Sequence, residues 1–241
     1  MTAIRTARER AREEVTRAIK DEARRRLAAE GAGKLSLRAV ARELGMVSSA
    51  LYRYFPSRDE LLTALIVDAY NALGDAVEGA LRAVPDADPI DRWAAVCRAA
   101  RAWALAHPHE YALIHGTPVP GYAAPADTSV PGGRVPLALV AVASHARRVG
   151  RLGPPEGGPP PEAVLADVAP LLPDHAPELT PETLAAVLAA WAQLLGLLSI
   201  EIFGQFNGVV SAREPFFDHA IARVGRSVGL RPAEEAGADL G

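Results

Sequence analysis

The chain of 241 residues has very little cysteine and few aromatic side chains. Its single cysteine, Cys97, excludes an intrachain disulfide, so a reducing cytoplasm is the simplest compartment. Cys97 lies in an apolar helical stripe and is expected to be a small core residue. Aromatic residues make up 5% of the chain, whereas Ala, Leu and Val dominate, which favours packed helices over sheets.

Long uninterrupted apolar runs are also missing. The most apolar stretch, residues 184–203, contains Gln193 and Glu201, and no run reaches the roughly 18 residues of a membrane-spanning helix. The first residues are charged, so no signal peptide is indicated. We therefore expect a cytoplasmic protein that does not enter a membrane, with enough length to bury a substantial core.

The net charge of −3 conceals an uneven distribution. Residues 1–60 contain 14 Lys and Arg against 9 Asp and Glu, a net charge of +5, and residues 61–241 contain 12 against 20, a net charge of −8. A basic first quarter on an acidic body is typical of a DNA-binding head with a separate body. A solvated charged surface would give the same numbers, so the asymmetry alone decides little.

Hydrophobic periodicity and capping residues predict an all-α fold with no strand. The head is expected to hold helices over residues 8–30, from Ser36, and over residues 48–55, followed by a long helix from Ser57 to near Pro85. The body is expected to hold helices that start at Asp88, cover 135–145 and 162–172, start at Thr180, and cover 211–228. The remaining expected segments are a short one at 108–115, a proline-rich loop at 116–131, a mobile linker at 150–161 and a disordered tail at 231–241.

Residues 36–55 carry most of the functional information. Two short helices are separated by Gly45, and the second buries Leu51 and Phe55, four residues apart. That spacing leaves Ser48, Ser49, Ala50, Tyr52 and Arg53 facing outward. Small polar side chains can approach base edges in the DNA major groove while Tyr and Arg reach phosphates, so the pattern predicts DNA binding.

The segments Leu35–Gly45, Ala50–Phe55 and Ser57–Leu62 together resemble the TetR family of transcriptional regulators. The resemblance is specific over about residues 12–72, where the Leu-Tyr-x-x-Phe sequence stands between the two turns. It implies a helix-turn-helix head at residues 1–56 and a larger helical regulatory and dimerisation domain at 57–230. The segment Ala106–Gly116 is similar to a subgroup named for a Trp-His-Gly element, with Ile114 where Trp would stand.

The resemblance implies a role for each matching residue. Arg38 lies where members contact a base or phosphate, and Ser48, Ser49 and Ala50 would face base edges. The other positions implied to contact DNA, chiefly its phosphates, are Ser36, Tyr52, Arg53, Tyr54 and Arg58. The two tyrosines could instead be half-buried head residues, and Arg38 and Arg53 could be solvated charges. The sequence leaves open whether Val47 or Ser48 caps the third helix.

Members of the family usually hold a small molecule in the body, and its binding releases the operator. The candidate lining residues are mostly apolar or aromatic and include a few polar groups, which suits an apolar or aromatic effector. They are Trp93, Trp103, His107, Tyr111, His115, Leu139, Val142, His145 and Trp191. The alternative for Trp93 and Trp191 is simple core packing.

The last two helices are expected to pair with a second copy, because the long one carries apolar residues on more than one face. A monomer that buries both faces internally is the alternative. The expected function is a homodimeric repressor of a palindromic operator, with no cofactor and no catalytic residue. The alternatives are an activator without small-molecule control, or a helical ligand-binding or metal-dependent enzyme that uses His107, His109 and His115.

Overall fold

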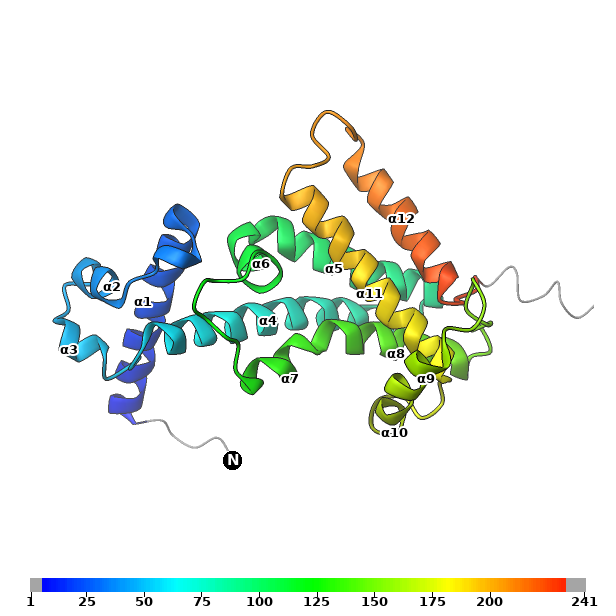
Figure 1. The fold of residues 1–241 in the computed structure, drawn as a ribbon, viewed down its shortest axis with the longest axis horizontal. Helices are drawn as coiled ribbons and strands as arrows, with labels where there is room; N and C mark the ends of the chain where they lie inside the picture. Colours follow the sequence, from blue (N-terminus) through cyan, green and yellow to red (C-terminus); the bar gives the residue numbers. More distant parts are fainter. Residues whose placement is uncertain (1–5, 233–241) are drawn as a thin grey trace, which may run out of the picture. The chain divides into compact units, whose positions relative to one another are not determined.

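A computed structural model describes residues 6–232, and Figure 1 gives the order and labels of the helices. The chain divides into two compact units. Unit 1 holds the residues up to Tyr70 together with Pro108–Ser129, and unit 2 holds Asn71–His107 together with the residues from Val130 onward. The compact unit that contains the head therefore extends past the expected boundary at residue 56, into α4 (Arg58–Ala83) and α6 (Pro108–His115).

Unit 1 is built around a small helical core. Its helices are α1 (Ala7–Glu30), α2 (Leu37–Glu43), α3 (Ser48–Leu51), the first part of α4 (Arg58–Ala83) and α6 (Pro108–His115), with short 3₁₀ turns at Ala32–Lys34 and Ala126–Thr128. The buried side chains recur with helical spacing along α1, α2 and α4. They are Ile19, Ala23, Leu27, Leu35, Leu37, Val40, Ala41, Leu51, Phe55, Leu61, Leu62 and Leu65.

Local sequence signals place both ends of α1. The Thr6 hydroxyl accepts a hydrogen bond from the Glu9 amide, and the Glu9 carboxylate accepts one from the Thr6 amide, which forms a capping box. At the other end Gly31 adopts φ 79°, a conformation that glycine allows without steric cost. Its amide donates to the Leu27 carbonyl.

Unit 2 is also helical. Besides the rest of α4 it contains α5 (Pro89–Ala106), α8 (Arg134–Arg148), α9 (Glu162–Val168), α10 (Leu172–His175), α11 (Pro181–Ile202) and α12 (Arg213–Ser227), and a short α7 (Ser129–Gly132) crosses the unit boundary. Helix α5 packs against α8, α11 and α12. In Figure 1, α11 and α12 run antiparallel, side by side.

Trp93 shows why the centre of unit 2 is tightly packed. Its side chain is fully buried, and its indole Nε1 donates to the Ile221 carbonyl at 3.1 Å. A methyl group added at Gly225 would lie 3.1 Å from the Trp93 ring, closer than most side chains approach. The small residue on α12 is therefore what lets the indole enter the core.

Two loop expectations, for residues 116–131 and 150–161, need correction. The segment expected to be a proline-rich loop at 116–131 contains a 3₁₀ turn at Ala126–Thr128 and the start of α7. The expected linker at 150–161 lacks helix but is held in place, because the Gly153 amide donates to Gly229 and the Glu156 amide to Ser227. An isolated β-bridge also joins Leu152 to Leu230.

The expected tail starts at residue 231, which the structure still describes. The Arg231 amide donates to the Arg151 carbonyl at 3.0 Å, so the chain is still attached to unit 2 at this point. The rest of that prediction, residues 233–241, lies outside the described residues.

Among the residues that are described, α11 is long and apolar enough to cross a membrane by length and composition, and 33% of its most apolar window is buried.

Candidate functional site

The turn between α2 and α3 sets the geometry of the head. Gly45 adopts φ 64°, and the Met46 amide donates back to the Ala41 carbonyl at 2.9 Å. This closes α2 and redirects the chain within a few residues. Helix α3 then begins at Ser48 with Val47 as its N-cap, so Val47 takes the cap position without a side-chain hydrogen bond.

Helix α3 is shorter than expected. It ends at Leu51 rather than Phe55, and the next residues continue as tight turns in which the Tyr54 amide donates to the Leu51 carbonyl at 2.8 Å. The Phe55 amide also donates to Leu51, at 3.1 Å. Val47 offers no side-chain acceptor to the first amides of this short helix.

The predicted division between buried and outward residues is present in this short segment. Leu51 is fully buried and Phe55 is 7% exposed, whereas Tyr52 is 42% exposed. Ser48, Ser49 and Arg53 are exposed, and Ala50 is half-buried. We call these outward residues, 48–50 together with 52 and 53, the recognition surface.

Two residues at the start of α2 are exposed as well. Ser36 is the N-cap of α2, as predicted, but its side chain makes no capping hydrogen bond. Its hydroxyl and the Arg38 guanidinium are both on the surface. Both groups are therefore accessible to a ligand from solvent.

A groove lined by three arginines lies beside the recognition segment. Its volume is about 400 Å³, and its lining residues are Arg8, Ala11, Arg12, Val15, Arg53 and Tyr54. The Arg12 guanidinium lies 5.3 Å from the centre of the half-buried Tyr54 ring, a cation–π contact that orients it. We call this feature the arginine groove; no carboxylate is among its lining residues.

The sequence reasoning missed Arg8 and Arg12. Their four-residue spacing places both on one face of α1, and Ala11 and Val15 lie beside them on that face. That spacing was visible in the sequence, but nothing in it showed that Arg53 and Tyr54 would lie against the same face.

The four cations in the second half of α1 are used differently. Lys20 and Arg24 both bind Asp68 of α4, at 2.9 and 2.7 Å, and Arg24 also binds Glu110 of α6 at 2.9 Å. Arg25 and Arg26 bind the buried carboxylate of Glu22 at 2.6 and 2.8 Å. The pairs with Asp68 and Glu110 tie α1 to α4 and α6, and all four cations are engaged by carboxylates of the chain.

Arg58, one of the predicted phosphate contacts, makes hydrogen bonds within its own chain. Its Nε donates to the Leu35 carbonyl at 3.2 Å, and its Nη2 donates to the Ala32 carbonyl at 2.9 Å. The guanidinium thus satisfies carbonyls in the connection between α1 and α2. Its position at the start of α4 is as predicted, but its side chain is engaged by its own chain.

The nine expected effector-lining residues are divided between the two units. Tyr111 and His115 belong to unit 1, and the other seven belong to unit 2. Trp93, Leu139 and Val142 are fully buried among other core residues. Trp103 stacks on the exposed His107 with ring centres 5.1 Å apart, and His145 and Trp191 are half-buried. None of these nine residues is in the lining of the three cavities of unit 2.

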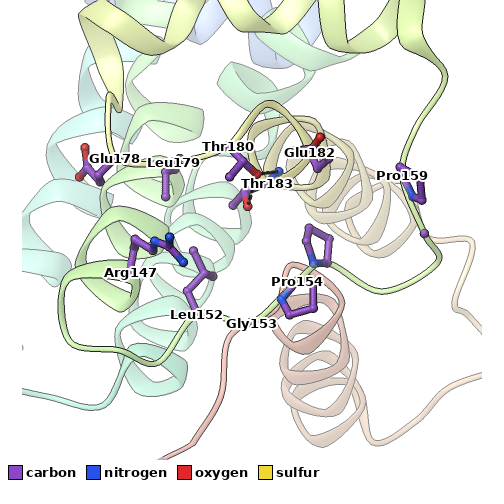
Figure 2. A pocket seen from close by; sticks show the side chains of 12 residues that line it. Arg147, Leu152, Gly153, Pro154, Pro159, Glu178, Leu179, Thr180, Glu182 and Thr183 are labelled. Carbon is purple, nitrogen blue, oxygen red and sulfur yellow. Dashed lines mark hydrogen bonds between the residues drawn. The ribbon is translucent and has the colours of Figure 1, made fainter.

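Three cavities in unit 2 are lined by other residues. One of about 470 Å³ lies between the 152–159 segment and the start of α11, and Figure 2 shows Pro154 and Pro159 across from Thr180 and Thr183. A second, of about 410 Å³, lies between α11 and α12. A third, of about 550 Å³, is lined by α4, α5 and α8.

Titratable side chains in the chain interior show the effect of burial. Desolvation lowers the pKa of His115 to about 4, so this histidine is neutral at pH 7. Burial raises the pKa of the Cys97 thiol, which keeps it protonated. Within residues 6–232, no group of three or more His, Cys, Asp or Glu side chains is arranged to hold a metal ion.

Comparison with known proteins gives matches in both units. Residues 19–65 match the family described as "Bacterial regulatory proteins, tetR family", and residues 93–224 match "Tetracyclin repressor-like, C-terminal domain". The HTH-type transcriptional regulators Rv1816 of Mycobacterium tuberculosis and Mb1846 of Mycobacterium bovis are each 39% identical over 207 residues. That alignment covers 82% of this chain and 84% of each relative. Neither match names the Trp-His-Gly subgroup, which is not confirmed.

Solved structures show the same fold. The crystal structure of the regulatory protein SCO4313 superposes with a TM-score of 0.73 at 36% identity, covering 91% of this chain and 98% of that one. The TetR family regulator PfmR from Thermus thermophilus has a TM-score of 0.55 at 17% identity and covers 88% and 96%, which supports the fold alone. The relatives at 39% identity and the two family matches show that this chain belongs to the TetR family of DNA-binding transcriptional regulators.

Proposed function

We propose that the protein is a ligand-responsive repressor that binds a palindromic operator as a homodimer in the cytoplasm. Regulators of this family bind DNA operators as dimers and respond to small molecules. The sign of regulation and the operator's symmetry are our own assignments for this chain. The repressor assignment follows the family, and the operator and dimer assignments are supported by the recognition surface and by the exposed side of α11.

The observation that carries the proposal is the recognition surface beside the arginine groove. Ser48, Ser49 and Ala50 are small enough for α3 to approach base edges closely, and the Ala50 methyl can meet a thymine methyl. Tyr52 and Arg53 are exposed next to them, where they can reach phosphates. No carboxylate lines the groove, so its positive charge is available to the DNA backbone.

Three further residues complete the proposed interface. Ser36 and Arg38 would contact phosphate or base from the start of α2. Tyr54 would act mainly through its ring, which holds Arg12 in the groove at 5.3 Å. Arg58 would support the interface indirectly, by fixing the α1–α2 connection.

The α11–α12 face supports the homodimer. Helix α11 exposes Gln193, Gly196 and Ile200 along one side, and a methyl group added at Gly196 would meet no atom within 4 Å. The groove of about 410 Å³ between α11 and α12 has an apolar floor that includes Leu197 and Val224. Two such helix pairs related by a two-fold axis would bury this face and double the number of base contacts.

Effector control is the third part of the proposal. An effector that binds one dimer conformation more tightly than the other shifts the population and lowers DNA affinity by its differential affinity for the two. The nine residues named from the sequence remain our expectation for an apolar or aromatic effector. The buried packing of Trp93, Leu139 and Val142 means that such a ligand would have to displace core contacts.

The DNA-binding part can be tested by selecting preferred duplexes from a random pool and measuring affinity at fixed salt. Tyr52→Ala and Arg53→Ala should each weaken binding to the selected duplex by about 1–3 kcal/mol while leaving the dimer folded. Arg98→Ala removes an arginine that is 58% exposed on α5 and should bind like the wild type. Unchanged affinity in both head variants would contradict the contact assignment, and a wild-type protein without sequence preference would contradict the operator.

A further inference from the structure

Arg92, in the first turn of α5, is a buried cation with an unusual set of partners. The residue is 9% exposed. Its Nη1 donates to two backbone carbonyls at the end of α4, Val84 at 2.5 Å and Pro85 at 2.7 Å. Both hydrogens of Nη1 are thereby used, which leaves the edge formed by Nε and Nη2 for another acceptor.

That remaining edge is incompletely satisfied. The Nε atom is shielded from solvent and has no hydrogen-bond partner in the structure. The Nε and Nη2 hydrogens point in parallel from one edge of the planar guanidinium, and a carboxylate can accept both at once. A buried donor without an acceptor is costly, so its presence calls for a specific reason.

Arg92 also differs from the other shielded arginines of unit 2. Arg101 pairs with Glu201 at 2.6 Å, Arg134 with Glu78 at 2.7 Å and Arg151 with Asp88 at 2.5 Å. Arg92 has no carboxylate within 4.0 Å among residues 6–232. Burial lowers its pKa, and the charge of Arg148 lowers it further, whereas Asp86 acts in the opposite sense. The surroundings therefore favour a negative charge from outside the chain.

A cavity of about 550 Å³ has Arg92 among its lining residues. Its apolar wall is formed by Leu81 and Pro85 from the end of α4 and by Leu137, Ala138 and Ala141 from α8. The polar lining consists of Glu78, Arg82, Arg92 and Arg134. Arg134 is already neutralised by Glu78 and Asp75, and Arg82 lies 3.7 Å from Glu78. Arg92 is thus the lining cation that has no anion of its own.

We propose that this cavity binds a small organic carboxylate whose anionic end meets the free edge of Arg92 after a shift of the guanidinium, because Nε is shielded from solvent in this structure. The apolar body of the ligand would lie against Leu81, Leu137 and Ala141. The cavity volume is in the range of small-molecule sites, and one charged group in an otherwise apolar wall fixes a ligand's orientation. The site is separate from the nine residues named above, and its effect on DNA binding rests on the proposed function.

The test uses matched acid and amide pairs on the full-length protein, measured by calorimetry and thermal unfolding. The probes are octanoate with octanamide and phenylacetate with phenylacetamide, which have similar shapes but differ in charge. At least one acid should bind in the millimolar range or tighter and raise the melting temperature, and its amide should bind at least ten-fold more weakly. The proposal is overturned if neither acid binds, or if the amides bind as well as the acids.

Variants locate the binding. Arg92→Gln should weaken binding of the acid at least ten-fold. This change also removes the hydrogen bonds to Val84 and Pro85, so a second variant, Ala141→Trp, leaves Arg92 unaltered. Ala141 is exposed, and the indole should fill the mouth of the cavity and abolish binding. Arg98→Gln, on the same helix outside the cavity, should bind like the wild type. Wild-type affinity in both Arg92→Gln and Ala141→Trp would overturn the site.

Operator binding separates this inference from the proposed function. An acid that binds at Arg92 and weakens operator affinity would support both. An acid that binds there without changing operator affinity would support the site and contradict its regulatory role. A protein that binds the acid yet shows no preferred duplex would uphold the site and contradict the operator.

Discussion

At the residue scale, two arginines five positions apart have different tasks. Arg53 is exposed on the recognition surface, whereas Arg58 donates hydrogen bonds to carbonyls of the α1–α2 connection. Sequence alone could place both near the DNA, because both lie close to helix ends. It could not show that the Ala32 and Leu35 carbonyls would lie within reach of Arg58, since that depends on how the connection folds back.

Arg58→Ala should therefore act on stability. Removal of the guanidinium leaves the Ala32 and Leu35 carbonyls without their donor and should lower the free energy of unfolding by about 1–3 kcal/mol, measured in urea. Arg38→Ala, at an exposed position on α2, is the matched control and should change stability by less than about 0.5 kcal/mol while weakening DNA binding. If Arg58→Ala were as stable as the wild type but bound DNA poorly, Arg58 would be a phosphate contact after all.

His115 predicts a pH dependence of stability. Its pKa is about 4 in the folded chain, depressed by burial, against an ordinary value of 6.5. The unfolded chain therefore binds the proton more readily, and the stability from neutral His115 is present above pH 6.5 and lost as the pH falls toward 4. The difference between the two pKa values corresponds to roughly 3 kcal/mol in the free energy of unfolding.

Replacing the imidazole tests this assignment. In His115→Phe the free energy of unfolding should fall less between pH 6.5 and pH 4 than in the wild type, because the titrating group is gone. The phenyl ring can keep the contacts with Tyr70 and Tyr111, whose rings lie 5.7 and 5.1 Å from the imidazole. Parallel pH profiles for the two proteins would show that other groups cause the acid destabilisation.

At the element scale, the start of a helix was easier to predict than the residue at which it stops. Ser36 before α2 and Pro89 at the start of α5 mark helix starts in the sequence. The capping box at Thr6 marks a third, which the expected start at residue 8 did not use. The short α3 was not foreseen, because the Leu51 and Phe55 spacing fits both a helix and a helical turn followed by tighter turns. The helical part of the 116–131 segment was missed because its prolines obscure any periodicity.

The arginine groove gives a prediction for α1. In the Arg8→Ala, Arg12→Ala double variant, log affinity should fall less steeply with log salt concentration. The slope should decrease by about 0.9 for each phosphate that the two guanidinium groups neutralise. The sequence preference should be retained. Arg17→Ala is a matched control, because Arg17 is exposed on α1 but does not line the groove. An unchanged slope in the double variant would limit the DNA interface to α2, α3 and the turn after α3.

At the scale of the whole molecule, the sequence indicated a head, a body and an all-α fold, and the family assignment is confirmed. The effector site was the hardest part to predict. Trp93 and Cys97 on one face of α5 are compatible with either a pocket wall or a packed core. Only the residues that pack against this face, such as Ile221 and Gly225, distinguish the two. Those partners lie more than 120 residues away in the sequence.

The dimer proposal predicts the effect of a charge on the open face of α11. Ile200→Asp, at a position 38% exposed, should yield monomers in sedimentation experiments and lower operator affinity, because a buried carboxylate in the pairing face is costly. Val149→Asp, at a position 48% exposed on another surface, should remain dimeric. A dimeric Ile200→Asp protein with normal operator affinity would place the pairing face elsewhere.

The environment of Cys97 has a practical consequence. This side chain is the chain's sole sulfhydryl, is 1% exposed and is kept in its unreactive protonated form by its surroundings. Maleimide reagents should therefore not label the native protein. One engineered surface thiol would then accept a fluorophore or spin label at a single chosen place, so that distances between the two heads of an assembly could be followed without first removing the natural residue.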